Sequence, residues 1–425
     1  MRINFKVISM IVLIGVVITI LCGAYIITDL KTREEQTLDI INRRQELTAR
    51  EEKLAGIKNN YNSTVKVSDN ATIYRKDNDS YIAAGSINKD VIVELEQIAN
   101  PSLENEYFKI LDTDYYLSYD DVEKTDISND KRYLNYLEFP LEITTDSNTI
   151  FYDKNGNELF SLDNPITAKV IINNENYYGI KLLSNLVYVK KESVNTTTEL
   201  EDTNIDLIAK ELPAILYHFI YLNGDPSCNE TICHSEEQID SHFKFLHDND
   251  VFTLNTDEVL SFIKEEIRLP KKSILITIDD GARAENFIPF LEKYQLNATL
   301  FLVSSWYPVS KFSSPYLEIA SHTHDMHTTG VCPTGQGGGI NCLDEETILT
   351  DLKNSRATLN NTKAFCFPFF EYSDYSINLV KEAGFEMAFI GGGTKIKPGI
   401  DPYKIPRYTF FNNTSVDYLR RLVFT

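Results

Sequence analysis

The segment 273–281, Ser-Ile-Leu-Ile-Thr-Ile-Asp-Asp-Gly, limits the fold of this chain more than any other stretch. Its first six residues are mostly aliphatic or β-branched, which predicts a strand buried on both faces, as in a parallel sheet or a barrel. Two carboxylates at the end of such a strand are costly to bury unless they are paired, hydrogen-bonded or bound to metal. In α/β barrels catalytic residues occupy this position. An ordinary Asp-Asp-Gly turn that caps the next helix is the alternative that these residues leave open.

An uncharged, mostly aliphatic run extends over residues 7–28. It is long enough to cross a bilayer as a helix of about 20 residues. Because a small-residue cleavage site is missing, retention is favoured over removal as a signal peptide. We therefore predict a transmembrane anchor at residues 1–28, with Arg2 and Lys6 on the cytoplasmic side. The expected location is the cell membrane, with a single pass and extracellular C-terminal domains.

The charge of the chain argues against two classes of partner. There are 41 Lys and Arg against 62 Asp and Glu, a net charge of −21, so nucleic acid and anionic lipid are excluded for the outer part. Within residues 29–62, Ile40, Leu47, Leu54 and Tyr61 recur every seven residues. This spacing predicts a helical stalk, with a weak homodimer through its single apolar seam.

Residues 63–195 differ in composition from the expected stalk. Short segments rich in Tyr, Ile and Val alternate there with Asn, Asp and Gly. This alternation is typical of all-β structure. Residues 72–79 are echoed by 149–156. The repeat resembles tandem bacterial SH3-like barrels, at residues 63–127 and 128–195. Such modules often bind cell-wall polymer, and a spacing role is the alternative.

Residues 196–211 are polar and read as a linker, and short apolar runs then alternate with helical patterns in residues 212–425. Eight strands with intervening helices predict an irregular (β/α) barrel as the C-terminal domain. The expected strands are 214–217, 251–254, 273–278, 298–303, 317–321, 364–367, 386–390 and 404–408, and the expected helices are 236–248, 256–267, 284–295, 344–360, 373–384 and 414–422.

Polar residues that can bind metal or move protons follow three of these strands. They are His218, the pair Asp279 and Asp280, and the segment 321–327, which contains three of the chain's seven histidines. One Asp and two His form a ligand set with an open position, as catalytic zinc requires. Taken alone, His218 is more typical of a core histidine.

Residues 277–281, Thr-Ile-Asp-Asp-Gly, resemble the Thr-Phe-Asp-Asp-Gly motif of polysaccharide deacetylases, the NodB-homology family (carbohydrate esterase family 4). The spacing from His322 to His327 is similar to that of a circularly permuted branch, which includes poly-N-acetylglucosamine deacetylases. In that branch the acid histidine lies on the first strand in a Tyr-His pair, and Leu216-Tyr-His218 resembles it. The resemblance covers roughly residues 213–425.

The resemblance implies a role for five residues. Asp279 is implied as general base and His218 as general acid. Asp280, His322 and His327 are implied as the ligands of one divalent ion. One carboxylate and two imidazoles suit zinc best, with cobalt, nickel or manganese as alternatives.

The segment 364–370, Ala-Phe-Cys-Phe-Pro-Phe-Phe, resembles the third motif of the family, which usually ends Tyr-Pro-Tyr-Gly in this branch. Here Phe369 replaces the Tyr and Phe370 replaces the Gly. A backbone N–H can still serve an oxyanion hole, so Phe369 is a candidate for the substrate site. Arg407 resembles a residue near the end of the domain that orients a carboxylate, and a structural arginine is the alternative.

Four histidines remain outside these roles. His324 is expected to point away from its neighbours by alternation. His234, His242 and His247 lie in or near an amphipathic helical pattern, and we expect them to be solvated.

The cysteines indicate an oxidising compartment. Two pairs of cysteines lie close together in the sequence, Cys228 with Cys233 and Cys332 with Cys342. We predict that each pair forms a disulfide that closes a loop. A cysteine zinc site is the alternative. Apart from Cys22 in the expected anchor, Cys366 is the remaining cysteine, and it lies in an apolar run where we expect a buried free thiol.

The implied reaction is metal-dependent hydrolysis of the N-acetyl group on N-acetylglucosamine units of a cell-wall polysaccharide. The wall-binding modules and the membrane tether make peptidoglycan the expected substrate, and exported poly-β-1,6-N-acetylglucosamine, which the permuted motif order favours, is the alternative. A catalytically inactive glycan-binding wall protein is the rival from another class, because the third motif is altered.

Overall fold

The computed structural model describes residues 31–32, 35–36, 38–39, 41–49, 63–96, 107–225, 228 and 230–425. The described residues of the expected stalk are helical, and a homodimer there stays a prediction.

The predicted membrane anchor is corrected. In the part of the chain that the structure describes, no helix is both long and apolar enough to span a bilayer. The expected architecture with a transmembrane helix, and the single-pass membrane location inferred from it, are not borne out. The apolar run that carried both predictions, residues 1–28, lies outside the described residues.

The chain forms two compact units. It returns from the second unit to the first in two short segments. The first comprises residues 1–129, 158–163 and 182–185, and the second comprises residues 130–157, 164–181 and 186–425.

The first unit is built from antiparallel strands. Strand β10, from the second predicted module, pairs with β3 of the first, so the strands of the two modules are not separate, and the SH3-like fold of the modules stays a prediction. Ser86 and Ser161 hydrogen-bond across this pair at 2.9 Å. The strands are β1 (Ser63–Val67), β2 (Ala71–Asp77), β3 (Ser80–Ile87), β4 (Ile92–Leu95), β5 (Tyr107–Lys109), β6 (Tyr115–Ser118), β7 (Val122–Lys124) and β10 (Glu158–Leu162), in the orders β4-β1-β7 and β10-β3-β2-β6-β5.

The second unit begins with a series of antiparallel strands. Its strand order is β14-β8-β11-β12-β13-β9. Within this unit Glu258, which is buried at the start of α3 (Thr256–Ile263), accepts hydrogen bonds from Arg132 and from the Tyr136 hydroxyl, the latter at 2.8 Å. The strands are β8 (Leu141–Thr145), β9 (Thr149–Tyr152), β11 (Thr167–Asn173), β12 (Tyr177–Leu182), β13 (Asn185–Lys190) and β14 (Val194–Glu199).

The rest of the second unit is a parallel half-barrel with strand order β23-β22-β21-β20-β19-β15-β24, and β18 also pairs with β19. An isolated bridge between Phe389 and Ile405 links the edge strand β23 to the segment that precedes β24. The strands are β15 (Ala214–Tyr217), β18 (Phe252–Leu254), β19 (Ser273–Asp280), β20 (Ala298–Leu302), β21 (Leu317–Ser321), β22 (Ala364–Cys366), β23 (Met387–Phe389) and β24 (Tyr408–Thr409), and two short strands, β16 (Phe219–Tyr221) and β17 (Cys233–Ser235), pair beside them.

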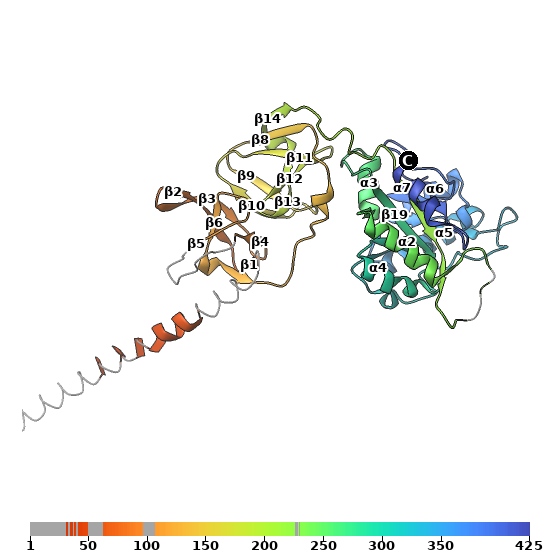
Figure 1. Ribbon diagram of the computed structural model, residues 1–425, viewed down its shortest axis with the longest axis horizontal. Coiled ribbons are helices and arrows are strands. Elements are labelled where there is room, and N and C mark those ends of the chain that lie inside the picture. Colours follow the sequence, from red (N-terminus) through yellow and green to blue (C-terminus); the bar gives the residue numbers. More distant parts are fainter. Residues whose placement is uncertain are drawn as a thin grey trace, which may run out of the picture. The chain divides into compact units, whose positions relative to one another are not determined.

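Helices cover the outside of this sheet (Figure 1). Ile274, Ile276 and Ile278 of β19 pack in one buried cluster with residues of α2 and α4, because alternate side chains of a strand share a face. Side-chain caps from Ser, Asn or Asp begin five of the six helices. The helices are α2 (Glu236–Asp248), α3 (Thr256–Ile263), α4 (Ile288–Tyr294), α5 (Glu345–Thr358), α6 (Asp374–Glu382) and α7 (Val416–Phe424).

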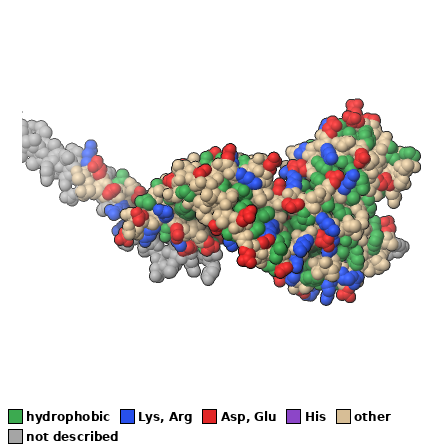
Figure 2. All heavy atoms as spheres, turned by 90° about the horizontal axis from the view of Figure 1, so that it is seen from above, with side chains coloured by type: hydrophobic (Ala, Val, Ile, Leu, Met, Phe, Trp, Pro, Cys, Tyr) green, Lys and Arg blue, Asp and Glu red, His purple; other side chains and the backbone are tan. Residues whose placement is uncertain are grey.

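The surface is mixed in charge. Figure 2 shows acidic and basic side chains interspersed with apolar ones on the face that it draws. The excess negative charge of the chain, −21 in total, is therefore not concentrated in one acidic patch on this face.

Candidate active site

Strand β19 places the side chain of Asp279 in the interior of the half-barrel. Leu275 packs there in a buried cluster with Phe301 and Phe389. Thr277 and Asp279 follow at intervals of two, so they share this face. Asp279 is 2% exposed at the carboxyl end of the strand. Its carboxylate therefore needs a partner inside the protein.

Arg407 supplies that partner. Its Nη1 donates to Asp279 Oδ1 at 2.7 Å and its Nη2 donates to Oδ2 at 2.9 Å. Nη1 also donates to the Thr277 hydroxyl at 3.1 Å. Burial raises the pKa of Asp279, but the guanidinium of Arg407 outweighs it and lowers this pKa to about 2. Asp279 is thus held in one orientation and ionised. The sequence had left Arg407 open between an orienting and a structural role.

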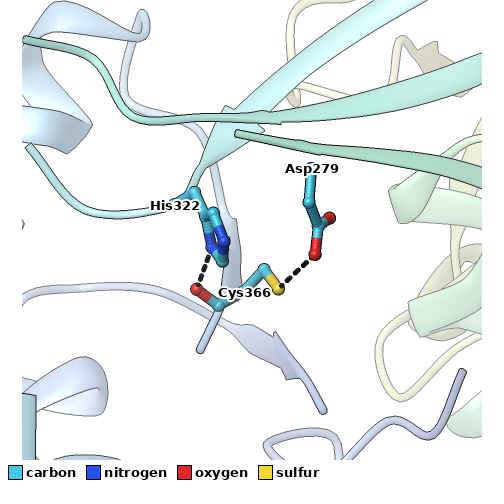
Figure 3. A group of neighbouring side chains, drawn as sticks. All are labelled: Asp279, His322 and Cys366. Carbon is cyan, nitrogen blue, oxygen red and sulfur yellow. Dashed lines mark hydrogen bonds between the residues drawn. The ribbon is translucent and has the colours of Figure 1, made fainter. Parts of the chain in front are cut away.

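Cys366 lies between Asp279 and His322 (Figure 3). Its thiol donates to Asp279 Oδ2 at 3.6 Å and its sulfur accepts from Arg407 Nη2 at 2.8 Å. Its carbonyl oxygen accepts from His322 Nδ1 at 2.8 Å. Burial raises the pKa of the thiol, which keeps it protonated.

Asp280, His322 and His327 converge on one point. The Asp280 Oδ1 atom is buried and has no hydrogen-bond partner among the described residues. His322 Nε2 lies 3.4 Å and His327 Nε2 lies 3.2 Å from this oxygen. Because Nδ1 of His322 is hydrogen-bonded to a carbonyl, its Nε2 is the nitrogen left for a metal.

These distances fit a metal ion. Atoms that lie about 2.0–2.1 Å from a tetrahedral ion are about 3.3–3.4 Å apart. The three side chains offer one carboxylate and two imidazoles, which suit zinc, cobalt or nickel. Burial lowers the pKa of His327 to about 4, whereas Cys366 and Asp280 raise the pKa of His322 despite its burial, so metal binding would release a proton from His322.

A second group, Asp279, His322 and Cys366, also places three potential ligand atoms within 4.8 Å of one another. It is the poorer metal site, because Arg407 donates to both Asp279 oxygens and to the Cys366 sulfur. A guanidinium cation in contact with two of the three ligands repels a second cation.

The backbone turn at the end of β19 makes the side chains of Asp279 and Asp280 point in different directions. Asp280 has a φ of 76° and Gly281 a φ of 108°, both in the left-handed region. A Cβ on Gly281 would lie 2.4 Å from Leu302 Cδ1, so glycine is required there. This turn directs Asp280 to the histidines, whereas Asp279 keeps the direction of the strand.

His218 follows β15 at the same carboxyl edge of the sheet as Asp279. Its Nδ1 is buried, and in the described part of the chain nothing hydrogen-bonds to it. Burial lowers the pKa of His218, while the charges of Asp279 and Asp280 raise it. An imidazole with an unpartnered nitrogen is free to hydrogen-bond to a substrate.

The expectation that His234 and His242 are solvated is wrong, because both are buried. His242 Nδ1 accepts from the Tyr217 hydroxyl at 2.9 Å and its Nε2 donates to the Thr414 carbonyl at 3.1 Å. His242 shares the inward face of α2 with Ile239. That spacing of three residues was the signal available in the sequence.

Two histidines lie apart from the metal ligands, as expected. His247 is exposed. His324 Nδ1 is 3.0 Å from the Ser304 hydroxyl, and this histidine is outside both potential ligand groups.

Aromatic side chains surround His327. The ring centroid of Phe369 is 4.4 Å and that of Trp306 is 5.3 Å from the His327 ring. Trp306 is 42% exposed. The sequence reasoning missed Trp306, although it is the single tryptophan of the chain. Phe369 lies in the site, and its oxyanion role stays a prediction.

The disulfide predictions are supported. Cys228 pairs with Cys233 and Cys332 pairs with Cys342, while Cys366 is free and buried.

Residues 266–388 match the polysaccharide deacetylase family, a range that includes Asp279, Asp280, His322 and His327. The chain contains a polysaccharide deacetylase domain. The deacetylase domain is that of a hydrolase acting on N-acetyl groups. Members of this family are metal-dependent in general, which agrees with the donor set of Asp280 and the two histidines.

The deacetylase is related to curated enzymes from staphylococci. It is 25% identical to the poly-beta-1,6-N-acetyl-D-glucosamine N-deacetylase of Staphylococcus aureus (strain MRSA252) over 228 residues, 48% of this chain and 77% of that enzyme. The enzyme of the same name from Staphylococcus epidermidis is 26% identical over 203 residues, 42% of this chain and 68% of that enzyme. A solved de-N-acetylase from Aggregatibacter actinomycetemcomitans is 20% identical with a TM-score of 0.43, covering 50% of this chain and 99% of that one.

Proposed function

We propose that this deacetylase hydrolyses the N-acetyl group of N-acetylglucosamine units in a polymer, with poly-β-1,6-N-acetylglucosamine as its substrate. One observation carries the chemistry. An unpartnered Asp280 oxygen faces two imidazole nitrogens, next to Asp279, which Arg407 fixes in orientation. The relatedness to the staphylococcal enzymes favours the β-1,6-linked polymer. Peptidoglycan, which the predicted wall-binding modules favoured, is the competing substrate.

Asp280, His322 and His327 hold the divalent ion in this proposal. Such an ion supplies a Lewis acid and lowers the pKa of a coordinated water towards about 7.

Asp279 acts as the general base. It is ionised at neutral pH, because the neighbouring guanidinium lowers its pKa to about 2. Two hydrogen bonds from Arg407 fix its direction, so a carboxylate lone pair stays aimed at the attacking water. Asp279 takes a proton from this water as the oxygen attacks the acetamide carbon.

His218 acts as the general acid. It protonates the nitrogen of the departing sugar amine as the C–N bond breaks, so that acetate and a glucosamine unit are released. The proton accepted by Asp279 balances the proton given by His218. The Phe369 N–H is the proposed donor to the oxyanion, since its ring lies 4.4 Å from that of His327.

Acetate release from the purified full-length protein tests the proposal. The substrates are poly-β-1,6-N-acetylglucosamine, β-1,4-linked N-acetylglucosamine oligomers and peptidoglycan, each before and after chelation and after zinc is restored. We expect zinc-dependent acetate release that is fastest with the β-1,6-linked polymer. Acetate release from peptidoglycan alone would show that peptidoglycan is the substrate. No release from any of these glycans would favour the inactive glycan-binding protein.

A further inference from the structure

The two histidines of the candidate metal site lie at the two ends of one short loop. His322 directly follows β21, and His327 comes five residues later. Their Nε2 atoms lie 3.4 Å and 3.2 Å from Asp280 Oδ1. The four residues between them, Thr-His-Asp-Met, include neither glycine nor proline, the residues that most strongly impose a turn. We therefore expect contacts from outside the loop to hold the conformation that brings the two imidazoles together.

Thr323 shows that this loop needs such contacts. Its φ is 77°, in the left-handed region that a β-branched residue rarely adopts. Its side chain is also fully buried. A residue persists in such a conformation only where the surrounding structure fixes it.

The carboxylate of Asp351, on α5, provides two of these contacts. Its Oδ1 atom accepts from the His324 N–H at 2.7 Å, and its Oδ2 atom accepts from the Asp325 N–H at 2.7 Å. Asp351 is 9% exposed and lies in the middle of the helix. Charge-assisted hydrogen bonds from two consecutive N–H groups fix both the position and the direction of these peptide units. Asp351 therefore orients the backbone between the two candidate metal ligands.

The carbonyl groups of the loop are bound by main-chain donors of the segment that follows β20. The Ser304 N–H donates to the Thr323 carbonyl at 3.1 Å, and the Ser305 N–H donates to the His324 carbonyl at 3.0 Å. These two bonds do not depend on the identity of a side chain, whereas the two bonds to Asp351 do. A substitution of Asp351 therefore changes how the loop is held and leaves its other side in place.

The same helix also holds the loop by packing. Met326, which directly precedes His327, is 6% exposed and lies in one buried cluster with Ile348 and Leu352 of α5. Asp351 is three residues after Ile348, so these side chains share one face of the helix. One face of α5 thus contacts the loop through both hydrogen bonds and apolar side chains.

We propose that Asp351 is a positioning residue of the metal centre, which holds the loop so that the imidazoles of His322 and His327 face Asp280. The inference rests on the proposed metal-dependent deacetylase function and deepens it. Asp351 is not itself a ligand, because it belongs to neither group of potential ligand atoms in the described part of the chain. Losing its two hydrogen bonds should weaken metal binding, since the imidazoles are then no longer held in the ligand geometry before the ion arrives.

Metal binding by the full-length protein tests this inference without any glycan. Asp351→Asn keeps the size of the side chain but leaves one oxygen as acceptor, so one N–H of the loop loses its partner. We expect the zinc dissociation constant, measured by competition with a chromophoric chelator, to rise about 10–100-fold. The visible absorption spectrum of the Co²⁺-loaded protein, which reports the ligand geometry, should change as well. Glu346→Gln, the same loss of charge at an exposed position of α5, should alter neither.

A further pair of variants separates positioning from a general loss of stability. Glu318→Gln removes one of the two carboxylate oxygens that accept from Thr256 and Thr299, outside the group of metal ligands. It should unfold at a lower urea concentration and keep the Co²⁺ spectrum of the unmodified protein. Asp351→Glu keeps both acceptor oxygens on a side chain longer by one methylene, so it should fold, displace the loop and change the spectrum. An unchanged zinc affinity and Co²⁺ spectrum in both Asp351 variants would overturn the proposal.

The metal measurements and the reaction can fail separately. Weaker zinc binding by Asp351→Asn, with no acetate release from any glycan by the unmodified protein, would support the positioning role and contradict the deacetylase function. Acetate release by the unmodified protein, with unchanged zinc affinity in both Asp351 variants, would do the reverse.

Discussion

Arg407 donates one hydrogen bond to each carboxylate oxygen of Asp279, at 2.7 and 2.9 Å, inside the half-barrel. Asp280, the next residue, has instead a buried oxygen that no described residue hydrogen-bonds. The two adjacent carboxylates therefore differ because Asp279 is paired with an arginine, whereas Asp280 faces two imidazoles. This difference supports the proposed roles, which are proton transfer for Asp279 and metal binding for Asp280.

Removing Arg407 should destabilise the fold as well as the reaction. Arg407→Met leaves Asp279 ionised and unpaired in the interior, which costs roughly 3–5 kcal/mol. The free energy of unfolding, measured in urea, should fall by this amount, and acetate release should be lost. Arg407→Met combined with Asp279→Leu should recover part of the stability and no activity. If Arg407→Met unfolds at the same urea concentration as the unmodified protein, the pairing is not structural.

Asparagine substitutions separate the two carboxylates. Asp279→Asn should keep the bound metal and lose most acetate release, because the base is absent and the ligands remain. Asp280→Asn should lose both, because an amide is a poor metal ligand. Elemental analysis and acetate release are measured on the same preparations. Equal metal content and retained activity in both variants would contradict these assignments.

The sequence carried enough information to locate the site. Asp279, His218 and His322 each follow an apolar run, and parallel strands bring their carboxyl ends to one edge. The partner of Asp279 was harder to predict, because Arg407 is 128 residues away in the sequence and comes close only because β15 pairs with both β19 and β24.

Other features depended on long-range packing. The pairing of β10 with β3 could not be predicted, because both repeats have the same alternation and either set of strands satisfies it. The burial of His242 was missed because histidine was counted as polar on a helix, whereas a tyrosine hydroxyl and a carbonyl satisfy both of its nitrogens.

Acid should destabilise the protein through His242. Burial lowers the pKa of His242 in the folded protein to about 4, from the ordinary value of 6.5 for histidine. Between these pH values the unfolded chain binds a proton that the folded protein excludes, so the stability present above pH 6.5 is lost as pH falls towards 4. From pH 7 to pH 5 the loss from this residue is about 2 kcal/mol.

His242→Gln should therefore reduce the loss of stability between pH 7 and pH 5, measured by urea unfolding at both values. The exposed His247→Gln is the matched control on the same helix and should keep the full loss. An identical pH dependence in the two variants would show that His242 is not the group responsible.

The loop closed by Cys332 and Cys342 should affect glycan binding more than metal binding. Backbone N–H groups of Gln336 and Gly338 donate to the Glu371 carboxylate, next to the third motif. A Cβ on Gly338 would lie 3.0 Å from Phe369 Cδ2, so the loop packs against a ring beside the metal ligand His327. None of the three metal ligands belongs to this loop. A short disulfide limits the freedom of such a glycine-rich segment.

Replacing both cysteines, Cys332→Ser with Cys342→Ser, should therefore raise KM for the glycan several-fold and leave the metal content near one ion per chain. Mass spectrometry of non-reduced peptides should find the 332–342 and 228–233 links, with Cys366 free. The matched comparison is Cys228→Ser with Cys233→Ser, which opens the other loop. A parallel fall of metal content and activity in the first variant would mean that its disulfide holds the ligands themselves, because loss of the loop alone leaves Asp280, His322 and His327 on β19 and the end of β21.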